Sequence, residues 1–220
     1  GGVAKFIQEG AYKYIPYCNL FRRTEFLDVE GYGRFEGYSN RDSLKYRSVY
    51  GLDDVLTLYR GTIRKVGFSK AWNMFVQLGM TDDSYVMENS EKMSYRTFVN
   101  SFLPYHPTDS VEIKTRLILK IDQDDIMWDK LLELDLFNPN KKVGLKNATP
   151  AQILEKILTD SWTLHPEDKD MIVMYHKFGY ELNGKKDKKN PKRFVMGKVK
   201  TLLLLPKTWG YPAQRGLCWY

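Results

Sequence analysis

The sequence predicts an α+β protein in which a mixed β-sheet is interrupted by a mostly helical insertion. Apolar and charged residues alternate at positions 26–30 and 33–38, on both sides of a Gly-Tyr-Gly turn, as in antiparallel strands with one covered face. Between residues 69 and 165 the period changes, and residues that favour helix N-termini repeatedly precede apolar residues at helical spacing. The predicted parts are 1–68, a first sheet part; 69–168, a helical insertion; 169–184, a returning strand; and 185–220, a basic tail.

The first part is expected to be mostly extended. Residues 1–8 carry Val3, Phe6 and Ile7 on one side and predict the end of a helix that stops at Gly10. Residues 14–17 are expected to be extended, because the residue before a proline avoids the helical region. A further strand is predicted from Val55 to Tyr59, after the strand that ends at Tyr38.

The insertion contains several helix starts. Each has a Ser, Thr or Asp positioned to cap the helix, followed by apolar residues spaced as a buried face. The predicted starts are Ser69 (with a stop at Gly79), Ser94, a capping box at Asp109–Glu112, the acids at 122–125, and a second capping box at Thr149–Gln152 with Pro150 at the first helical position. Residues 81–93 are expected to form a loop, and 171–182 return to strand and rejoin the sheet.

The net charge of +7 comes from the C-terminal segment. Residues 185–220 hold ten Lys or Arg and one acid, whereas the preceding 184 residues hold 24 basic and 26 acidic side chains. A nucleic-acid argument therefore rests on this segment alone, and no specific nucleic-acid partner is predicted.

Composition excludes several other classes of protein. No apolar run reaches the roughly 18 residues that a membrane span needs, and no secretory signal layout precedes the chain. Cys18 and Cys218 form neither a disulfide framework nor a zinc motif, which favours a cytoplasmic location. The absence of an initiator methionine predicts a piece of a longer protein, and the absence of Gly-x-Gly-x-x-Gly means that the chain carries no dinucleotide fingerprint.

Site chemistry is concentrated at residues 38–68. Asn40-Arg41-Asp42-Ser43 forms a polar turn after one predicted strand, and Arg60-Gly61-Thr62-Ile63-Arg64 follows the next. Arginine binds a carboxylate with a planar fork, and a serine or threonine hydroxyl can donate to a remaining lone pair. The two segments together predict a site for a ligand with several carboxylates, although exposed salt bridges at two strand ends would give the same pattern.

These segments resemble saccharopine dehydrogenase, the glutamate-forming enzyme. The resemblance is carried by Gly37-Tyr38-Ser39-Asn40-Arg41-Asp42-Ser43-Leu44-Lys45-Tyr46 and by Arg60-Gly61-Thr62-Ile63-Arg64-Lys65-Val66-Gly67-Phe68, and it continues to about residue 184. Ser39 departs from the family pattern, which commonly has proline there. The resemblance implies a substrate domain with a helical insertion, and a Rossmann nucleotide domain that is absent from this chain.

The resemblance also implies the roles of individual residues. Arg41, Thr62, Ile63 and Arg64 would bind the carboxylates of saccharopine, with Ile63 contributing backbone, and Asn40 and Ser43 would support the turn or the ligand. The complete enzyme would move hydride to NADP or NAD in lysine metabolism, while the cofactor carries the hydride chemistry. This chain alone would bind no cofactor and no metal and would be inactive, and no residue of it is singled out for proton transfer.

Several alternatives remain open at this stage. The chain could be a fragment of a carboxynorspermidine-type dehydrogenase, a non-catalytic ligand-binding module, or part of a homodimer whose aromatic faces meet. The tail could bind nucleic acid electrostatically. It could also be frame-shifted and disordered, since a reading two nucleotides later with permitted codons would give a Val-Gly-Leu-Pro helix typical of the family.

Isolated residues with known chemistries have simpler interpretations. His106, His165 and His176 lack metal-ligand spacing, and only His176 lies in a segment that resembles the family. The acids at 122–125 lack the glycine of a calcium loop and are expected at a helix N-terminus. Trp72, Trp128 and Trp162 are expected in the core or in packing between domains.

Overall fold

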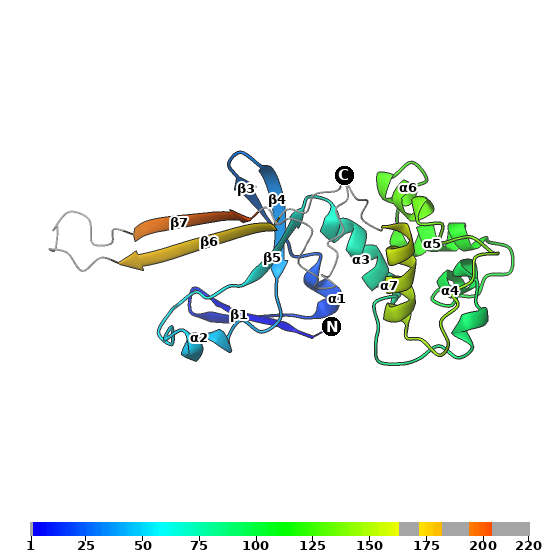
Figure 1. Cartoon of the computed structure of the whole chain (residues 1–220), viewed down its shortest axis with the longest axis horizontal. Helices are drawn as coiled ribbons and strands as arrows, with labels where there is room; N and C mark the ends of the chain where they lie inside the picture. Colours follow the sequence, from blue (N-terminus) through cyan, green and yellow to red (C-terminus); the bar gives the residue numbers. More distant parts are fainter. Residues whose placement is uncertain (1, 163–171, 182–193, 204–220) are drawn as a thin grey trace. The chain divides into compact units, whose positions relative to one another are not determined.

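The computed structural model describes residues 2–162, 172–181 and 194–203 (Figure 1). It divides into two compact units, of which the first holds residues 1–163 and the second holds the strands that follow. Within the described ranges, no helix is both long and apolar enough to cross a membrane. The cytoplasmic location stays a prediction.

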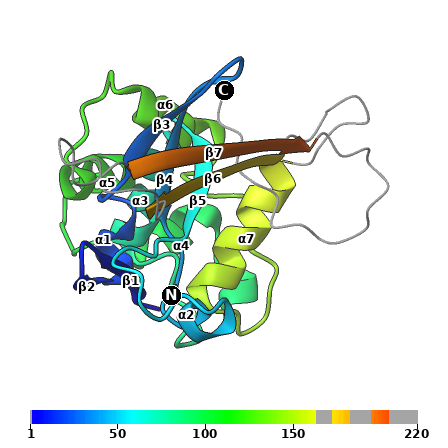
Figure 2. The ribbon, with the colours of Figure 1, turned by 90° about the vertical axis from the view of Figure 1, so that its left-hand side faces the viewer.

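The first unit begins with two antiparallel sheets (Figure 2). One is a hairpin of β1 and β2, and the other has the strand order β3-β4-β5. The strands are β1 (Ala4–Gln8), β2 (Ala11–Ile15), β3 (Glu25–Val29), β4 (Gly33–Ser39) and β5 (Gly61–Lys65). The short helices α1 (Tyr17–Leu20) and α2 (Tyr46–Val49) lie in the connections.

Two sequence predictions for this region are wrong. Residues 4–8 form a strand and not a helix end, because Ala4 and Phe6 are buried in a hairpin with β2 and five residues are too few to reveal a period. Val55–Tyr59 form no strand, and Leu58 makes only an isolated bridge to Ile7. The pairing strand is β5, where Thr62 and Ile63 supply the β-branched residues that favour strands.

The remainder of the first unit is helical, as predicted. Its elements are α3 (Phe68–Leu78), a 3₁₀ turn at Ser90–Lys92, α4 (Tyr95–Asn100), α5 (Val111–Leu119), α6 (Ile126–Glu133) and α7 (Pro150–Ser161). Ser94, Ser110, Asp125 and Thr149 are N-caps that accept backbone N–H donors, and Thr149 forms the predicted capping box with Gln152. The cap of α5 is Ser110 and not Asp109, with which the predicted box began. Asp125 accepts the N–H of Met127 at 2.8 Å, which confirms the predicted helix N-terminus, and it also pairs with Lys70 at 3.1 Å.

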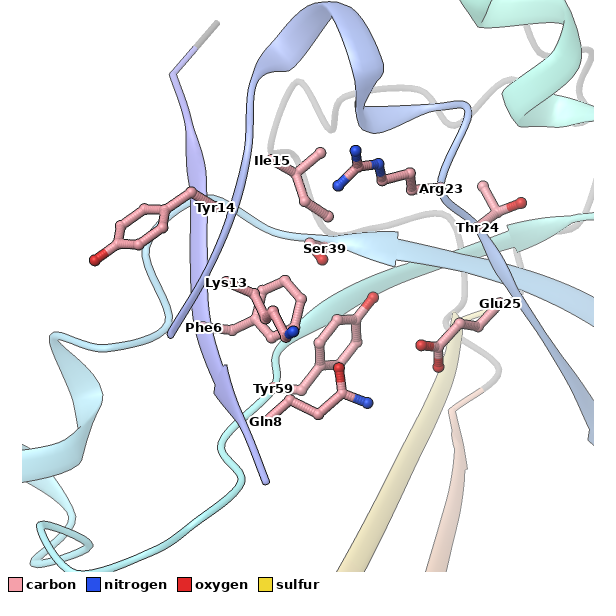
Figure 3. A pocket seen from close by; sticks show the side chains of 10 residues that line it. All are labelled: Phe6, Gln8, Lys13, Tyr14, Ile15, Arg23, Thr24, Glu25, Ser39 and Tyr59. Carbon is pink, nitrogen blue, oxygen red and sulfur yellow. The ribbon is translucent and has the colours of Figure 1, made fainter. Parts of the chain in front are cut away.

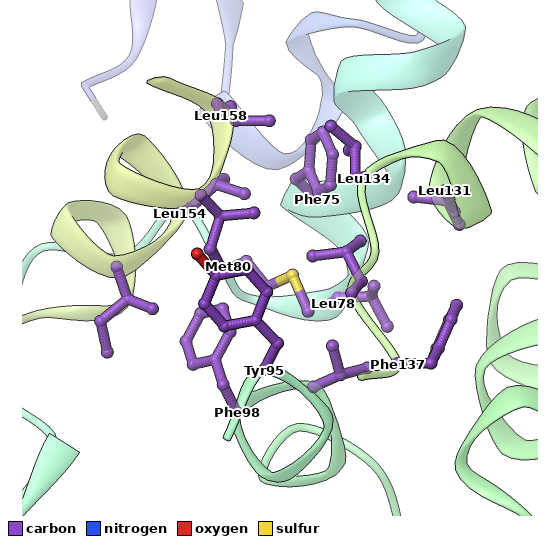
Figure 4. Packing of buried hydrophobic residues seen from close by; sticks show 14 of the residues in the cluster. Phe75, Leu78, Met80, Tyr95, Phe98, Leu131, Leu134, Phe137, Leu154 and Leu158 are labelled. Carbon is purple, nitrogen blue, oxygen red and sulfur yellow. The ribbon is translucent and has the colours of Figure 1, made fainter. Parts of the chain in front are cut away.

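The helices enclose one apolar cluster (Figure 4). Tyr95 and Phe98 are fully buried in it, and Phe75 brings α3 into the same cluster. Trp128 is buried in this cluster, as predicted, and Trp162 is partly buried and packs against it. Trp72 packs against this cluster and also against the apolar cluster of the strands, so α3 joins the helices to the sheet.

The second unit contains the antiparallel strands β6 (Ile172–Glu181) and β7 (Phe194–Leu203). The predicted strand at 171–182 is therefore present, but its described pairing is with β7, and its return to the first sheet stays a prediction. Strand β7 lies inside the basic segment 185–220, so residues 194–203 do not fit the alternative of a disordered tail. Val195, Val199 and Thr201 explain the difference, because β-branched residues favour strands.

Candidate functional site

The turn at residues 40–43 is joined to β1 and to the residue that precedes β5. The backbone N–H of Lys5 donates to the Arg41 carbonyl at 2.8 Å, and that of Ser43 donates to the Lys5 carbonyl at 2.8 Å. The N–H of Asn40 donates to the Arg60 carbonyl at 2.9 Å. These bonds fix the turn, so the predicted Asn40–Ser43 segment has a defined backbone.

Arg41 occupies an unusual backbone conformation within this turn. Its φ is 43°, in the left-handed region, and its side chain is exposed. A residue with a Cβ in this region costs about 1–2 kcal/mol, and such strain persists where the surrounding bonds determine it. The two bonds to Lys5 provide that constraint on the backbone, and the exposed side chain stays accessible to a ligand.

Ser43 and Arg60 contribute to the local structure. Ser43 is 1% exposed, and its hydroxyl accepts the N–H of Arg60 at 3.2 Å. The guanidinium of Arg60 lies over the ring of Tyr46, 4.0 Å from its centroid. Ser43 thereby supports the turn, and a direct contact of Ser43 or Asn40 with a ligand stays a prediction.

Thr62 and Arg64 share one face of the sheet with residues of β4. Glu36 pairs with Arg64 and Tyr38 pairs with Thr62, so these four side chains lie on the same face. Ile63 points to the opposite face, and its backbone contribution to binding stays a prediction. Thr62 and Arg64 were predicted beyond the end of a strand, whereas they lie within β5.

Arg64 is held by its neighbours without a counter-ion. Its guanidinium lies over the ring of Phe68, 5.1 Å from the centroid, and interacts with the Tyr38 hydroxyl. Burial raises the pKa of Tyr38, with opposing contributions from Arg64 and Thr62. Arg64 is half-buried, its Nε has no hydrogen-bond partner, and no carboxylate among the described residues forms an ion pair with it.

Glu36 would be the natural partner of Arg64, but its carboxylate has another use. It is 4% exposed and accepts the backbone N–H of Ser69 at 2.5 Å and that of Gly67 at 3.3 Å. The amides at the start of a helix have no partner within the helix, so the Glu36 carboxylate satisfies these two at the start of α3. The positive end of the helix dipole also favours an anion there. Ser69 is not the N-cap that the sequence predicted, because the cap position is Gly67 and its side-chain acceptor comes from β4.

A pocket of about 320 Å³ opens on the other face of this sheet (Figure 3). Ser39 and Tyr59 line it, and Ser39 precedes the turn and points away from the side on which Tyr38 and Thr62 lie. Its other lining residues are Phe6, Gln8, Lys13, Tyr14, Ile15, Arg23, Thr24 and Glu25. None of the predicted binding residues lines this pocket.

Gly61 has no room for a side chain. A Cβ placed there would lie 2.9 Å from the Tyr59 ring and 3.0 Å from the Tyr38 carbonyl oxygen. Burial raises the pKa of Tyr59, and its hydroxyl interacts with Ser39. Gly61 therefore makes room for a ring of its own chain.

The histidines add no metal site among the described residues. His106 lies 3.3 Å from Asp109 in the helical part. His165 lies outside the described residues, and His176 lies on β6 in the second unit, so its position near the site stays a prediction.

Known proteins resemble the chain over almost its whole length. Residues 1–214 match the saccharopine dehydrogenase C-terminal domain, so the match extends beyond residue 184 into the basic segment, where the frame shift stays a prediction. The mitochondrial alpha-aminoadipic semialdehyde synthase of Rattus norvegicus is 30% identical over 182 residues, covering 80% of this chain and 19% of that protein. The NADP(+), L-glutamate-forming saccharopine dehydrogenase of Saccharomyces cerevisiae is 27% identical over 222 residues, covering 95% of this chain and 48% of that protein.

A solved structure has the same fold. The apo histidine-tagged saccharopine dehydrogenase (L-Glu forming) from Saccharomyces cerevisiae superimposes with a TM-score of 0.72 at 19% identity. The superposition covers 91% of this chain and 44% of that one. The chain thus spans between a fifth and a half of the length of these relatives.

Proposed function

The chain belongs to the saccharopine dehydrogenase C-terminal domain family, and we propose that it supplies the substrate-binding part of an NADP-dependent saccharopine dehydrogenase. The yeast relative is named for NADP and for forming L-glutamate. The cofactor would bind to a part of the protein outside this chain and would supply the hydride chemistry. The residues of this chain would bind and orient saccharopine, which carries three carboxylates and two amines.

The observation that carries the proposal is the unpaired charge of Arg64. A half-buried cation is costly unless it meets an anion, and none of the described carboxylates forms an ion pair with Arg64. Its neighbour Glu36 is occupied by the first turn of α3. A substrate carboxylate would complete this site, with the hydroxyl of Thr62 next to it as a second donor.

Arg41 would supply the second cation of the site. Glu36 lies directly opposite Arg64 in the register of β4 and β5. From Glu36, β4 runs to Ser39, about 10 Å at 3.3 Å per residue, and the chain then enters the turn that contains Arg41. Arg64 within the sheet and Arg41 in the turn after β4 would bind separate carboxylates of one elongated ligand such as saccharopine.

The test is saccharopine binding by calorimetry with the 220-residue chain. Arg64→Gln and Arg41→Gln should each weaken binding about 10- to 100-fold, because each removes a charge-assisted contact. Arg34→Gln is the matched control, since Arg34 lies on the same sheet but forms its own ion pair with Asp28 at 2.9 Å. Equal losses in all three variants, or no binding by the unchanged chain, would refute the proposal.

A further inference from the structure

The side chain of Arg64 is held by two aromatic residues that the family motif does not single out for binding. Tyr38 lies next to it on the neighbouring strand, and the Tyr38 hydroxyl interacts with both Arg64 and Thr62. Phe68 lies under the guanidinium, with its ring centroid 5.1 Å away. We infer that Tyr38 and Phe68 are positioning residues, which hold the Arg64 guanidinium and the Thr62 hydroxyl ready for a carboxylate.

The position of Phe68 is fixed by packing on both sides. Its ring stacks on that of Tyr38 at 6.2 Å with an interplanar angle of 10°, and on that of Trp72 at 5.9 Å with an angle of 8°. The Tyr38 ring packs in turn against Phe21, at 4.8 Å. Because stacked rings inside a packed cluster have little freedom, the guanidinium rests on a rigid surface.

Glu36 keeps this arrangement free of a competing ion pair. Its two bonds to the first turn of α3 tie that turn, and with it Phe68, to β4. The same bonds engage the carboxylate that lies opposite Arg64 across the two strands. The stacking therefore orients the guanidinium of Arg64, and the bonds from Glu36 to α3 leave that guanidinium without an ion pair.

Orientation matters because arginine loses rotamer freedom on binding. A guanidinium that is already stacked and hydrogen-bonded has less freedom to lose, so binding is stronger for the same contact. Removing the Tyr38 hydroxyl keeps the charge of Arg64 but releases this constraint. We expect Tyr38→Phe to weaken saccharopine binding about 3- to 10-fold.

Two readouts on the 220-residue chain test the inference. The first is the ¹⁵Nε–¹Hε NMR signal of Arg64, assigned with Arg64→Gln, which should broaden or move toward the free-arginine position in Tyr38→Phe and Phe68→Leu. The second is calorimetric affinity for saccharopine. Tyr59→Phe is the matched control, because it removes a half-buried hydroxyl from the opposite face and should alter neither readout.

The outcomes separate this inference from the proposed function on which it rests. An Arg64 signal that stays unchanged in folded Tyr38→Phe overturns the positioning role, and so does unchanged affinity. If the unchanged chain does not bind saccharopine, the proposed function falls, while the NMR signal still decides whether Tyr38 and Phe68 hold the guanidinium. If Phe68→Leu does not fold, Tyr38→Phe alone decides.

Discussion

Replacing Glu36 by Gln should destabilise the first unit by about 2 kcal/mol. The carboxylate is 4% exposed and accepts two backbone N–H groups of α3, at 2.5 and 3.3 Å. Hydrogen bonds to a charged group contribute about 1.5–3 kcal/mol each, and a charge at a helix N-terminus contributes about 0.3–1 kcal/mol. Glutamine keeps the shape and one neutral acceptor, so we expect part of this sum to be lost.

Urea unfolding followed by tryptophan fluorescence measures the effect. Trp72 stacks on Phe68 and reports directly on α3. With a slope of about 2 kcal/mol per M, a loss of about 2 kcal/mol lowers the unfolding midpoint by about 1 M urea. Glu25→Gln is the control on the neighbouring strand, where the side chain is exposed and the change should stay within about 0.5 kcal/mol.

An unchanged unfolding midpoint in Glu36→Gln would refute this reasoning. If Glu36→Gln unfolds at the same urea concentration as the unchanged chain, the two contacts contribute no net stability. The account of α3 as a helix anchored by β4 would then be wrong. That result would also remove the explanation that Glu36 does not pair with Arg64 because it binds the amides of α3.

Three further changes test other parts of the structure. Gly61→Ala should cost about 1–3 kcal/mol in urea unfolding, because its Cβ would meet the ring of Tyr59 at 2.9 Å. Tyr95 donates to Asp160, and burial is the main reason why the pKa of Tyr95 is raised to about 12. The stability that the protonated Tyr95 contributes is therefore present below pH 10 and falls as the pH rises toward 12. Tyr95→Phe should lack this component of the pH dependence in urea titrations at pH 9 and pH 11. Arg41→Gly should change stability by less than about 1 kcal/mol, since relief of the left-handed strain offsets chain entropy, yet weaken saccharopine binding in calorimetry.

Local signals predicted the helical part of the fold well. Thr149 with Gln152, and Ser94 with its own first turn, form caps whose partners lie within a few residues. Such bonds depend on neighbouring residues alone, so the sequence contains the whole signal. The same local reasoning failed at Ser69, because the acceptor for that turn is Glu36, 33 residues earlier.

The strands were harder to predict because their pairing is not local. Ala4–Gln8 becomes a strand through its hairpin with β2, which no periodicity within five residues reveals. The site residues were found from their chemistry and from the family resemblance, but Tyr38 and Phe68 were not selected. Tyr38 and Phe68 lie beside Arg64 because of the register of β4 and β5 and the position at which α3 begins. Neither can be read from the amino-acid sequence alone.

The environment of Arg64 is better explained by binding than by stability. A half-buried guanidinium loses hydration, and stacking on Phe68 replaces only part of it. A fold selected for stability alone would pair Arg64 with Glu36 across the strands, yet Glu36 instead binds the amides of α3. Local departures from good polar pairing are expected at functional sites, where the missing partner comes from a ligand. The unpaired charge therefore supports the proposal that an anion from outside the chain binds to Arg64, and Arg41 in the turn after β4 would offer a partner for a second carboxylate.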